Sequence, residues 1–174
     1  HNYIMQAIEH LNSTSKLVIL ILYGMGLRVS ELENLCYEDF TQDWCRVRGK
    51  GNKERDVPII NSVADALKLY SLETTRSQGP IFIKNGKPLT VQQYQYILKK
   101  AFEPLAIHAT PHQMRHSFAT ELLNHGAGIM EVSEVLGHES VTTTQLYTQL
   151  GSAYKREQYL KHPLCGSKET SQKS

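Results

Sequence analysis

A glycine-flanked turn at residues 49–52 lies between two short β-type segments, and this pattern constrains the fold more than any other in the chain. The segments cover residues 43–47 and 55–59, and both have the composition of strands. We expect them to pair as an antiparallel hairpin, with the glycines providing the turn. Pro58 has no amide proton to donate, so it places the second strand near the edge of its sheet.

Helical patterns fill most of the remaining sequence. Ser13 or Thr14 is suited to cap a first helix, and Ser30 is suited to cap a segment that runs to residue 40. Thr90 and Thr110, the second followed by proline, are typical helix starts. The sequence predicts a mainly α domain with a small three-stranded antiparallel β-sheet. Its third strand is residues 81–83, and its later helices are residues 62–72, 90–102, 110–125, 129–136, 142–147 and 152–159.

The composition suits one domain with a real core, because 40% of the 174 residues are hydrophobic and 21% are charged. The longest apolar stretch, residues 17–27, is shorter than the roughly 18 residues that a membrane span requires. From the first residues we expect no signal segment. The three cysteines have neither disulfide-framework nor zinc-site spacing. We therefore expect a reducing, cytoplasmic location and no membrane partner.

The net charge of +2 says little about partners, but the basic residues are unevenly distributed. Between positions 46 and 55 the sole acidic residue is Glu54, and the basic residues are Arg46, Arg48, Lys50, Lys53 and Arg55. Such a cluster attracts DNA phosphates whatever the base sequence. The alternative is a hairpin face that is merely solvated.

Six residues in separate segments have the chemistry that a metal-free attack on a DNA phosphodiester needs. Guanidiniums stabilise the charge that develops on the non-bridging oxygens, because they bind two oxygens at once and stay protonated. An ammonium can protonate the leaving oxygen, imidazoles can transfer protons, and a phenol can act as the nucleophile. The six residues are Arg28, Lys50, His112, Arg115, His138 and Tyr147.

His112 and Arg115 are three residues apart, so a helix would present them on one face. His112 and His116 also have the spacing of two zinc ligands on a helix. However, Gln113 stands where a metalloprotease helix has glutamate, and the sequence offers no third ligand nearby. We therefore expect no metal, and we expect His116 to be structural.

The motifs that contain these residues are GLRVSEL, GKGNKER, TPHQMRHSFAT and LGHESVTTTQLYT. Together they resemble the motifs of the tyrosine recombinase (phage integrase) family, and their sequences are most similar to those of its Xer branch. The resemblance runs from about residue 19 to residue 160. It implies the catalytic-domain fold of that family. It also implies an enzyme without cofactor or metal that cleaves and rejoins DNA through a 3′-phosphotyrosyl intermediate.

The resemblance also assigns residues that chemistry alone leaves open. Physical reasoning does not separate Lys50 from Lys53, and the resemblance favours Lys50 because glycines flank it. Glu31 becomes the acid that holds a catalytic arginine or histidine in place. The alternative for Glu31 is an ordinary carboxylate in the first turn of a helix.

For the nucleophile, the resemblance favours Tyr147 among nine tyrosines, because it lies in the segment that matches the family's nucleophile motif. Tyr154 and Tyr159 are rivals by position. His138 follows a glycine at a predicted turn between helices, where an imidazole can be presented to a phosphate oxygen.

For the whole chain, the resemblance implies a catalytic domain over residues 1–160, a flexible tail over residues 161–174 and no N-terminal core-binding domain. The expected partners are double-stranded DNA and further recombinase subunits, in a homo- or hetero-tetramer joined through the C-terminal segment. The expected function is Xer-type resolution or integration. The alternatives are a type IB topoisomerase or telomere resolvase, and a non-catalytic DNA-binding module.

Overall fold

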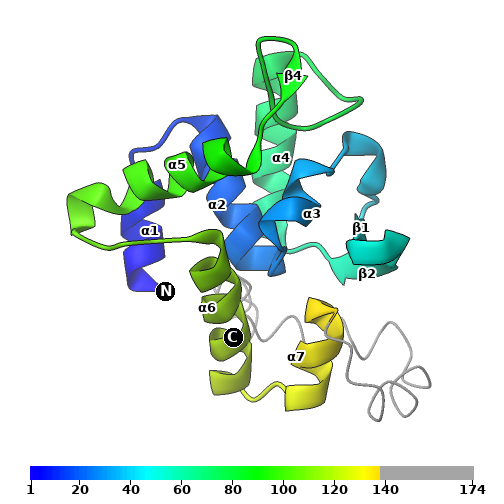
Figure 1. Ribbon diagram of the computed structural model, residues 1–174, viewed down its shortest axis with the longest axis vertical. Helices are drawn as coiled ribbons and strands as arrows, with labels where there is room; N and C mark the ends of the chain where they lie inside the picture. The colour runs from blue at the N-terminus through cyan, green and yellow to red at the C-terminus, as the bar shows by residue number, and fades with distance from the viewer. Residues whose placement is uncertain (138–174) are drawn as a thin grey trace, which may run out of the picture.

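The computed structural model describes residues 1–137, in which helices surround a central helix and one hairpin lies along a side (Figure 1). The first half contains α1 (Asn2–Ile8), α2 (Ser13–Met25), α3 (Val29–Glu33), β1 (Trp44–Arg48), β2 (Glu54–Pro58) and α4 (Asn61–Thr74). The second half contains β3 (Ile83–Lys84), β4 (Lys87–Pro88), α5 (Val91–Phe102), α6 (Pro111–Asn124) and α7 (Ile129–Leu136). Short 3-10 turns occur at η1 (Tyr37–Asp39), η2 (Lys50–Asn52) and η3 (Glu103–Leu105).

The central helix is α2, which is buried on every side from residue 17 to residue 25. A helix that is apolar all round must be enclosed, and α2 contacts α4, α5 and α6. The predicted cap is wrong, since Asn12 rather than Ser13 or Thr14 accepts the amide of Ser15 at 2.8 Å. None of the described helices is both long enough and apolar enough to cross a membrane.

The prediction of a three-stranded sheet is also wrong. Residues 1–137 contain two separate two-stranded antiparallel sheets, β1–β2 and β3–β4. The hairpin itself is confirmed, with each strand within one residue of its expected bounds. The third predicted strand instead forms a local hairpin, because Asn85 and Gly86 both have positive φ and close a tight turn. Ile81, just before it, lies in the core.

Several helices match their predicted positions, among them α4, α5, α6 and α7. Thr90 and Thr110 both accept an amide three residues ahead, as expected for helix caps. The segment over residues 29–40 is interrupted, however, and forms α3 followed by η1. Helix α1 was not expected from the sequence, and the predicted helices at residues 142–147 and 152–159 lie outside the described residues.

The turn after α2 is set by Gly26, which has φ of 63° and ends the helix in the left-handed conformation. A Cβ atom at this position would lie 2.4 Å from Cδ1 of Phe118, which is fully buried on α6. The close approach of these two residues brings the end of α2, two residues before Arg28, next to α6. It therefore places Arg28 close to the helix that bears Arg115.

We expect Gly26→Ala to lower the free energy of unfolding by about 2–4 kcal/mol. The left-handed conformation accounts for about 1 kcal/mol, and displacement of the Phe118 ring for the rest. The matched control is Gly86→Ala, where φ is 75° but an added Cβ meets nothing within 4 Å. Chemical denaturation would measure both variants. Equal losses would show that the contact with Phe118 contributes nothing.

Candidate active site

Arg28 is the residue immediately before α3, and its backbone is extended there. Its own amide donates to Oε2 of Glu31 at 2.9 Å, so this carboxylate caps the helix start instead of Ser30. The Arg28 guanidinium also donates to Oε1 of Glu31 at 3.2 Å. The Arg28 side chain remains 41% exposed, so part of its donor fork faces outward.

Glu31 is a buried carboxylate whose side chain is 1% exposed. Arg55 on β2 donates to both of its oxygens, with Nη1–Oε1 at 2.6 Å and Nη2–Oε2 at 3.0 Å. Burial opposes ionisation of Glu31, but the hydrogen bonds and charge of Arg55 and the Arg28 amide outweigh it. The pKa of Glu31 therefore lies below its usual value. The predicted role of Glu31 as a holding carboxylate agrees with these contacts.

Arg115 lies on α6 and is buried at the junction of three segments. Its guanidinium donates to the carbonyl of Gly26 at 2.6 Å and to the carbonyl of Leu136 at 2.5 Å. Burial, followed by the positive charge of Arg28, lowers the pKa of Arg115 to about 10. The side chain is therefore still cationic at neutral pH.

The structure thus gathers Arg28, Arg55 and Arg115 around Glu31, and we call these four residues the arginine centre. Three guanidiniums and one carboxylate leave two positive charges in excess. An anion is the ligand that such a site favours, and planar donor forks match the oxygens of a phosphate. The sequence segments that contribute are far apart, from α3, β2 and α6.

His112 lies one turn before Arg115, in the first turn of α6, and its side chain is exposed. Thr110 and Gln113 fix that helix start by exchanging hydrogen bonds at 2.9 and 3.2 Å. The helix therefore begins at Pro111 as predicted. Spacing along α6 places His112 and Arg115 on the same face.

Lys50 and Lys53 are both exposed at the loop between β1 and β2. Their loop begins beside the arginine centre, since a Cβ atom on Gly49 would lie 3.4 Å from Oε1 of Glu31. The Gly49 amide donates to the Lys53 carbonyl at 2.7 Å and closes the loop. The loop that carries both lysines thus starts beside Glu31, and the choice of Lys50 still rests on the resemblance.

The outer face of the hairpin is less basic than the sequence indicates. Arg46 pairs with Asp56 at 3.2 Å, and Arg48 pairs with Glu54 at 3.3 Å. Arg48 also reaches Asp39 at 3.1 Å. These arginines are exposed and can exchange their carboxylate partners for phosphates.

Arg55 differs from the other basic residues of the hairpin, because its guanidinium faces inward and is 15% exposed. It pairs in register with Val47, which is buried, whereas Arg46 pairs with the exposed Asp56. Alternation along a strand predicts this direction, so the sequence contained the signal. Its charge alone groups Arg55 with the DNA-contacting residues, whereas its contacts are with Glu31 and the end of α7.

Two of the six predicted catalytic residues, His138 and Tyr147, lie outside the described residues, as do Tyr154, Tyr159 and the tail. The described part ends at Gly137, directly after α7. Of the other four, Arg28 and Arg115 meet at the arginine centre, while Lys50 is exposed in the hairpin loop and His112 in the first turn of α6.

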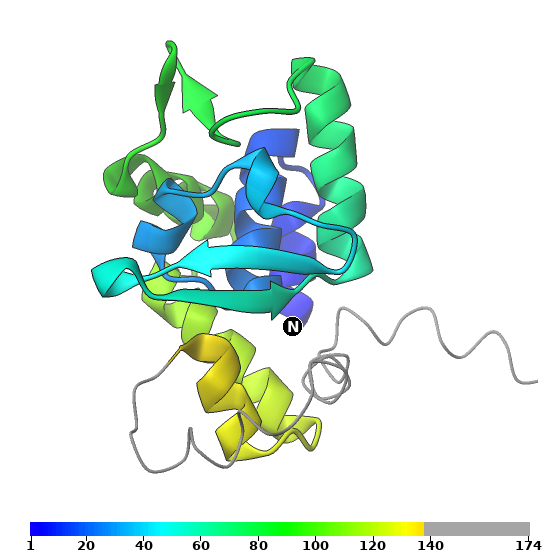
Figure 2. The same ribbon diagram turned by 90° about the vertical axis from the view of Figure 1, so that its right-hand side faces the viewer.

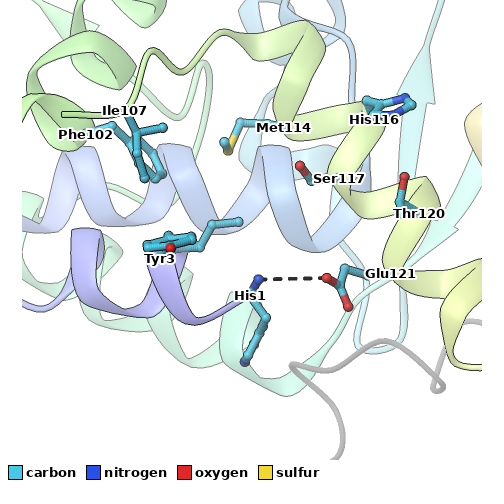
Figure 3. A pocket seen from close by; sticks show the side chains of 10 residues that line it. His1, Tyr3, Phe102, Ile107, Met114, His116, Ser117, Thr120 and Glu121 are labelled. Carbon is cyan, nitrogen blue, oxygen red and sulfur yellow. Dashed lines mark ion pairs between the residues drawn. The ribbon is translucent and has the colours of Figure 1, made fainter. Parts of the chain in front are cut away.

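A pocket of about 320 Å³ lies elsewhere, between α1, the end of α5 and α6 (Figure 3). Its lining includes Tyr3, Phe102, Met114 and His116, and the amino group of residue 1 pairs with Glu121 across it at 3.8 Å. Of the six predicted residues, the four that the structure describes all lie outside this lining. His116 is exposed and lines this pocket, and its structural role stays a prediction.

Comparison with known proteins places the chain in a family. The model of the phage integrase family matches residues 1–153, which is most of the chain. The chain therefore belongs to the phage integrase family.

Two curated relatives make the comparison more specific. The chain is 41% identical over 149 residues to tyrosine recombinase XerA of Pyrococcus furiosus, covering 82% of this chain and 52% of that protein. It is 41% identical over 167 residues to tyrosine recombinase XerC of Oceanobacillus iheyensis, covering 88% and 55%. The chain thus spans about half the length of the curated relatives that it matches.

A solved structure agrees with the sequence relatives. The crystal structure of XerA recombinase superposes with a TM-score of 0.72 at 30% identity, covering 93% of this chain and 62% of that one. The predicted recombinase catalytic-domain fold is confirmed by this similarity, apart from the strand count of its sheet.

We expect Glu31→Gln to lower the free energy of unfolding by about 3 kcal/mol at pH 7, because it leaves buried arginines without their carboxylate. The lowered pKa of Glu31 means that its contribution is present above the unfolded-state pKa and is lost as the pH falls through the folded-state pKa. The difference from the unsubstituted protein should therefore shrink below about pH 4.

Denaturation at a series of pH values would measure this dependence. Glu33→Gln in the same helix is the control, and its effect should be small. A difference for Glu31→Gln that stays constant into the acid range would contradict the ionised state of this carboxylate.

Proposed function

We propose that this chain is the catalytic domain of a site-specific DNA recombinase that cleaves and rejoins DNA through a 3′-phosphotyrosyl intermediate. The observation that carries the proposal is the arginine centre, where Arg28 and Arg115 meet beside a buried carboxylate. Family membership and the tyrosine recombinases XerA and XerC among the relatives support the same reaction.

In the proposed reaction, the Tyr147 oxygen attacks the scissile phosphorus and its proton passes to a histidine. Arg28 and Arg115 stabilise the charge on the non-bridging oxygens. The bond from phosphorus to the 5′ oxygen breaks, and Lys50 protonates that oxygen. Rejoining reverses these steps with a 5′ hydroxyl from the partner strand, so the phosphodiester energy is retained in the tyrosyl bond.

The proposal assigns His112 and His138 to proton transfer and hydrogen bonding at the phosphate, and Glu31 to positioning. The DNA backbone would be contacted from the hairpin by Arg46, Arg48 and Lys53. The side chains of Arg46 and Arg48 are exposed there and accessible to phosphates. Such contacts add affinity without reading sequence.

Double-stranded DNA is the proposed substrate. The proposed active assembly on that DNA is a homo- or hetero-tetramer of recombinase subunits joined through the C-terminal segment. The Xer names among the relatives favour resolution or integration as the reaction's outcome. The free thiols of Cys36 and Cys45 fit the proposed cytoplasmic location.

We expect the protein to form a covalent complex with a nicked duplex that carries its site, and Tyr147→Phe to abolish that complex. The phenol supplies the attacking oxygen, so its removal leaves no nucleophile. Tyr154→Phe and Tyr159→Phe are the matched controls and should retain the complex. Denaturing electrophoresis would detect the shifted band. Its persistence in Tyr147→Phe would move the nucleophile to another tyrosine.

We expect Arg28→Lys to slow formation of that complex by about a hundredfold or more, since a single ammonium replaces a fork that binds two oxygens. Arg115→Lys should have at least as large an effect, because it also loses the hydrogen bonds to Gly26 and Leu136. Arg76→Lys is the control, since its guanidinium donates to the carbonyls of Pro80 and Ile81 and has no part in the arginine centre. Single-turnover kinetics would measure the rates, and unchanged rates would refute the role of the arginine centre.

A further inference from the structure

Helix α7 ends directly against the arginine centre, and the way its last carbonyl groups are satisfied is informative. The final four carbonyls of a helix have no partner within the helix. In α7 the Gly137 amide donates to the carbonyls of Ser133 and Glu134. The other two accept from guanidiniums, Val135 from Arg55 Nε at 2.8 Å and Leu136 from Arg115 at 2.5 Å.

Arg55 therefore has two binding surfaces on one guanidinium. Its Nη1 and Nη2 atoms hold both oxygens of Glu31, and its Nε holds α7. A lysine could not reproduce this arrangement, because an ammonium is a single point of charge without a planar fork. Arg55 is the one residue of the hairpin that joins β2 to both α3 and α7 in the described contacts.

Gly137 provides a second contact between these elements. Its φ is 69°, and a Cβ atom there would lie 3.1 Å from Cδ of Arg55 and 3.3 Å from its Nε. The end of α7 thus packs directly on the Arg55 side chain. Figure 2 shows α7 below the hairpin, and α7 contacts α6 and β2.

We propose that Arg55 is a positioning residue that couples two events, the orientation of Glu31 with Arg28 and the docking of α7 on the arginine centre. Arg55 touches no reacting atom in this scheme. It acts through Glu31 on one side and through the α7 carbonyl on the other, so the two sides form or separate together. The effect on cleavage rests on the proposed function, whereas the effect on α7 does not.

The first test compares Arg55→Lys with Arg76→Lys, which makes the same exchange at a guanidinium that donates to the carbonyls of Pro80 and Ile81 instead of to α7. Hydrogen–deuterium exchange of the α7 amides should be faster in Arg55→Lys and unchanged in Arg76→Lys. Cleavage of a nicked duplex should fall by about tenfold to a hundredfold in Arg55→Lys alone. Unchanged α7 exchange would overturn the proposal even if cleavage fell.

The pH profile of cleavage separates positioning from general loss of structure. Glu31 faces Arg28, Arg55 and Arg115, and the hydrogen bond from Arg55 helps to lower its pKa. With Arg55→Lys the pKa of Glu31 should rise, so the acid limb of the profile should move to higher pH. A rate reduced equally at every pH would contradict coupling through Glu31.

The second test leaves every charge in place. Gly137→Ala pushes against Arg55, while Gly126→Ala carries a similar positive φ of 86° with nothing within 4 Å of the added Cβ. Faster α7 exchange and slower cleavage are expected in Gly137→Ala and not in Gly126→Ala. Equal effects of the two alanines would overturn the proposal.

The outcomes also separate this proposal from the function itself. If Arg55→Lys does not fold, the comparison of Gly137→Ala with Gly126→Ala decides whether the coupling exists. If the unsubstituted protein forms no covalent complex, the proposed function fails, and the α7 exchange still tests the coupling.

Discussion

The ionised carboxylate of Glu31 is the interaction on which this structure depends. It is buried, caps the start of α3 through the Arg28 amide and accepts both donors of the Arg55 fork. A buried charge is unfavourable unless it is paired and hydrogen-bonded, and here two segments supply the partners. Because one carboxylate serves a helix end, a strand and an arginine of the proposed catalytic set, the local fold and the site are established by the same contacts.

The core determines where those contacts can form. Helix α2 is enclosed, and its end at Gly26 lies against the buried ring of Phe118 on α6. That approach brings the Gly26 carbonyl within reach of the Arg115 guanidinium, which donates a hydrogen bond to it. A side chain of different length at position 115 would lose this hydrogen bond. The position of the arginines thus follows from packing at a point where no side chain larger than hydrogen fits.

Much of this arrangement could be predicted from local signals in the sequence, whereas the contacts between distant residues could not. The hairpin and the threonine-capped helices α5 and α6 were predictable, because their turn and capping residues act within a few positions. The cap of α3 was missed, because Ser30 had the usual residue type while the carboxylate of Glu31 reaches back to Arg28. The third strand was misassigned because Asn85 and Gly86 favour a local turn over a distant partner. Arg28 and Arg115 were recognised by type and motif, but the link through Arg55 depends on contacts between residues 24 and 80 positions apart.

The clustering of three guanidiniums has a consequence for the protein without its substrate. Like charges at close range repel, and burial, followed by the positive charge of Arg28, lowers the pKa of Arg115. The folded chain therefore stores unfavourable electrostatic energy in the place where a phosphate diester would neutralise it. Part of the folding free energy is thus given up for a preorganised anion site.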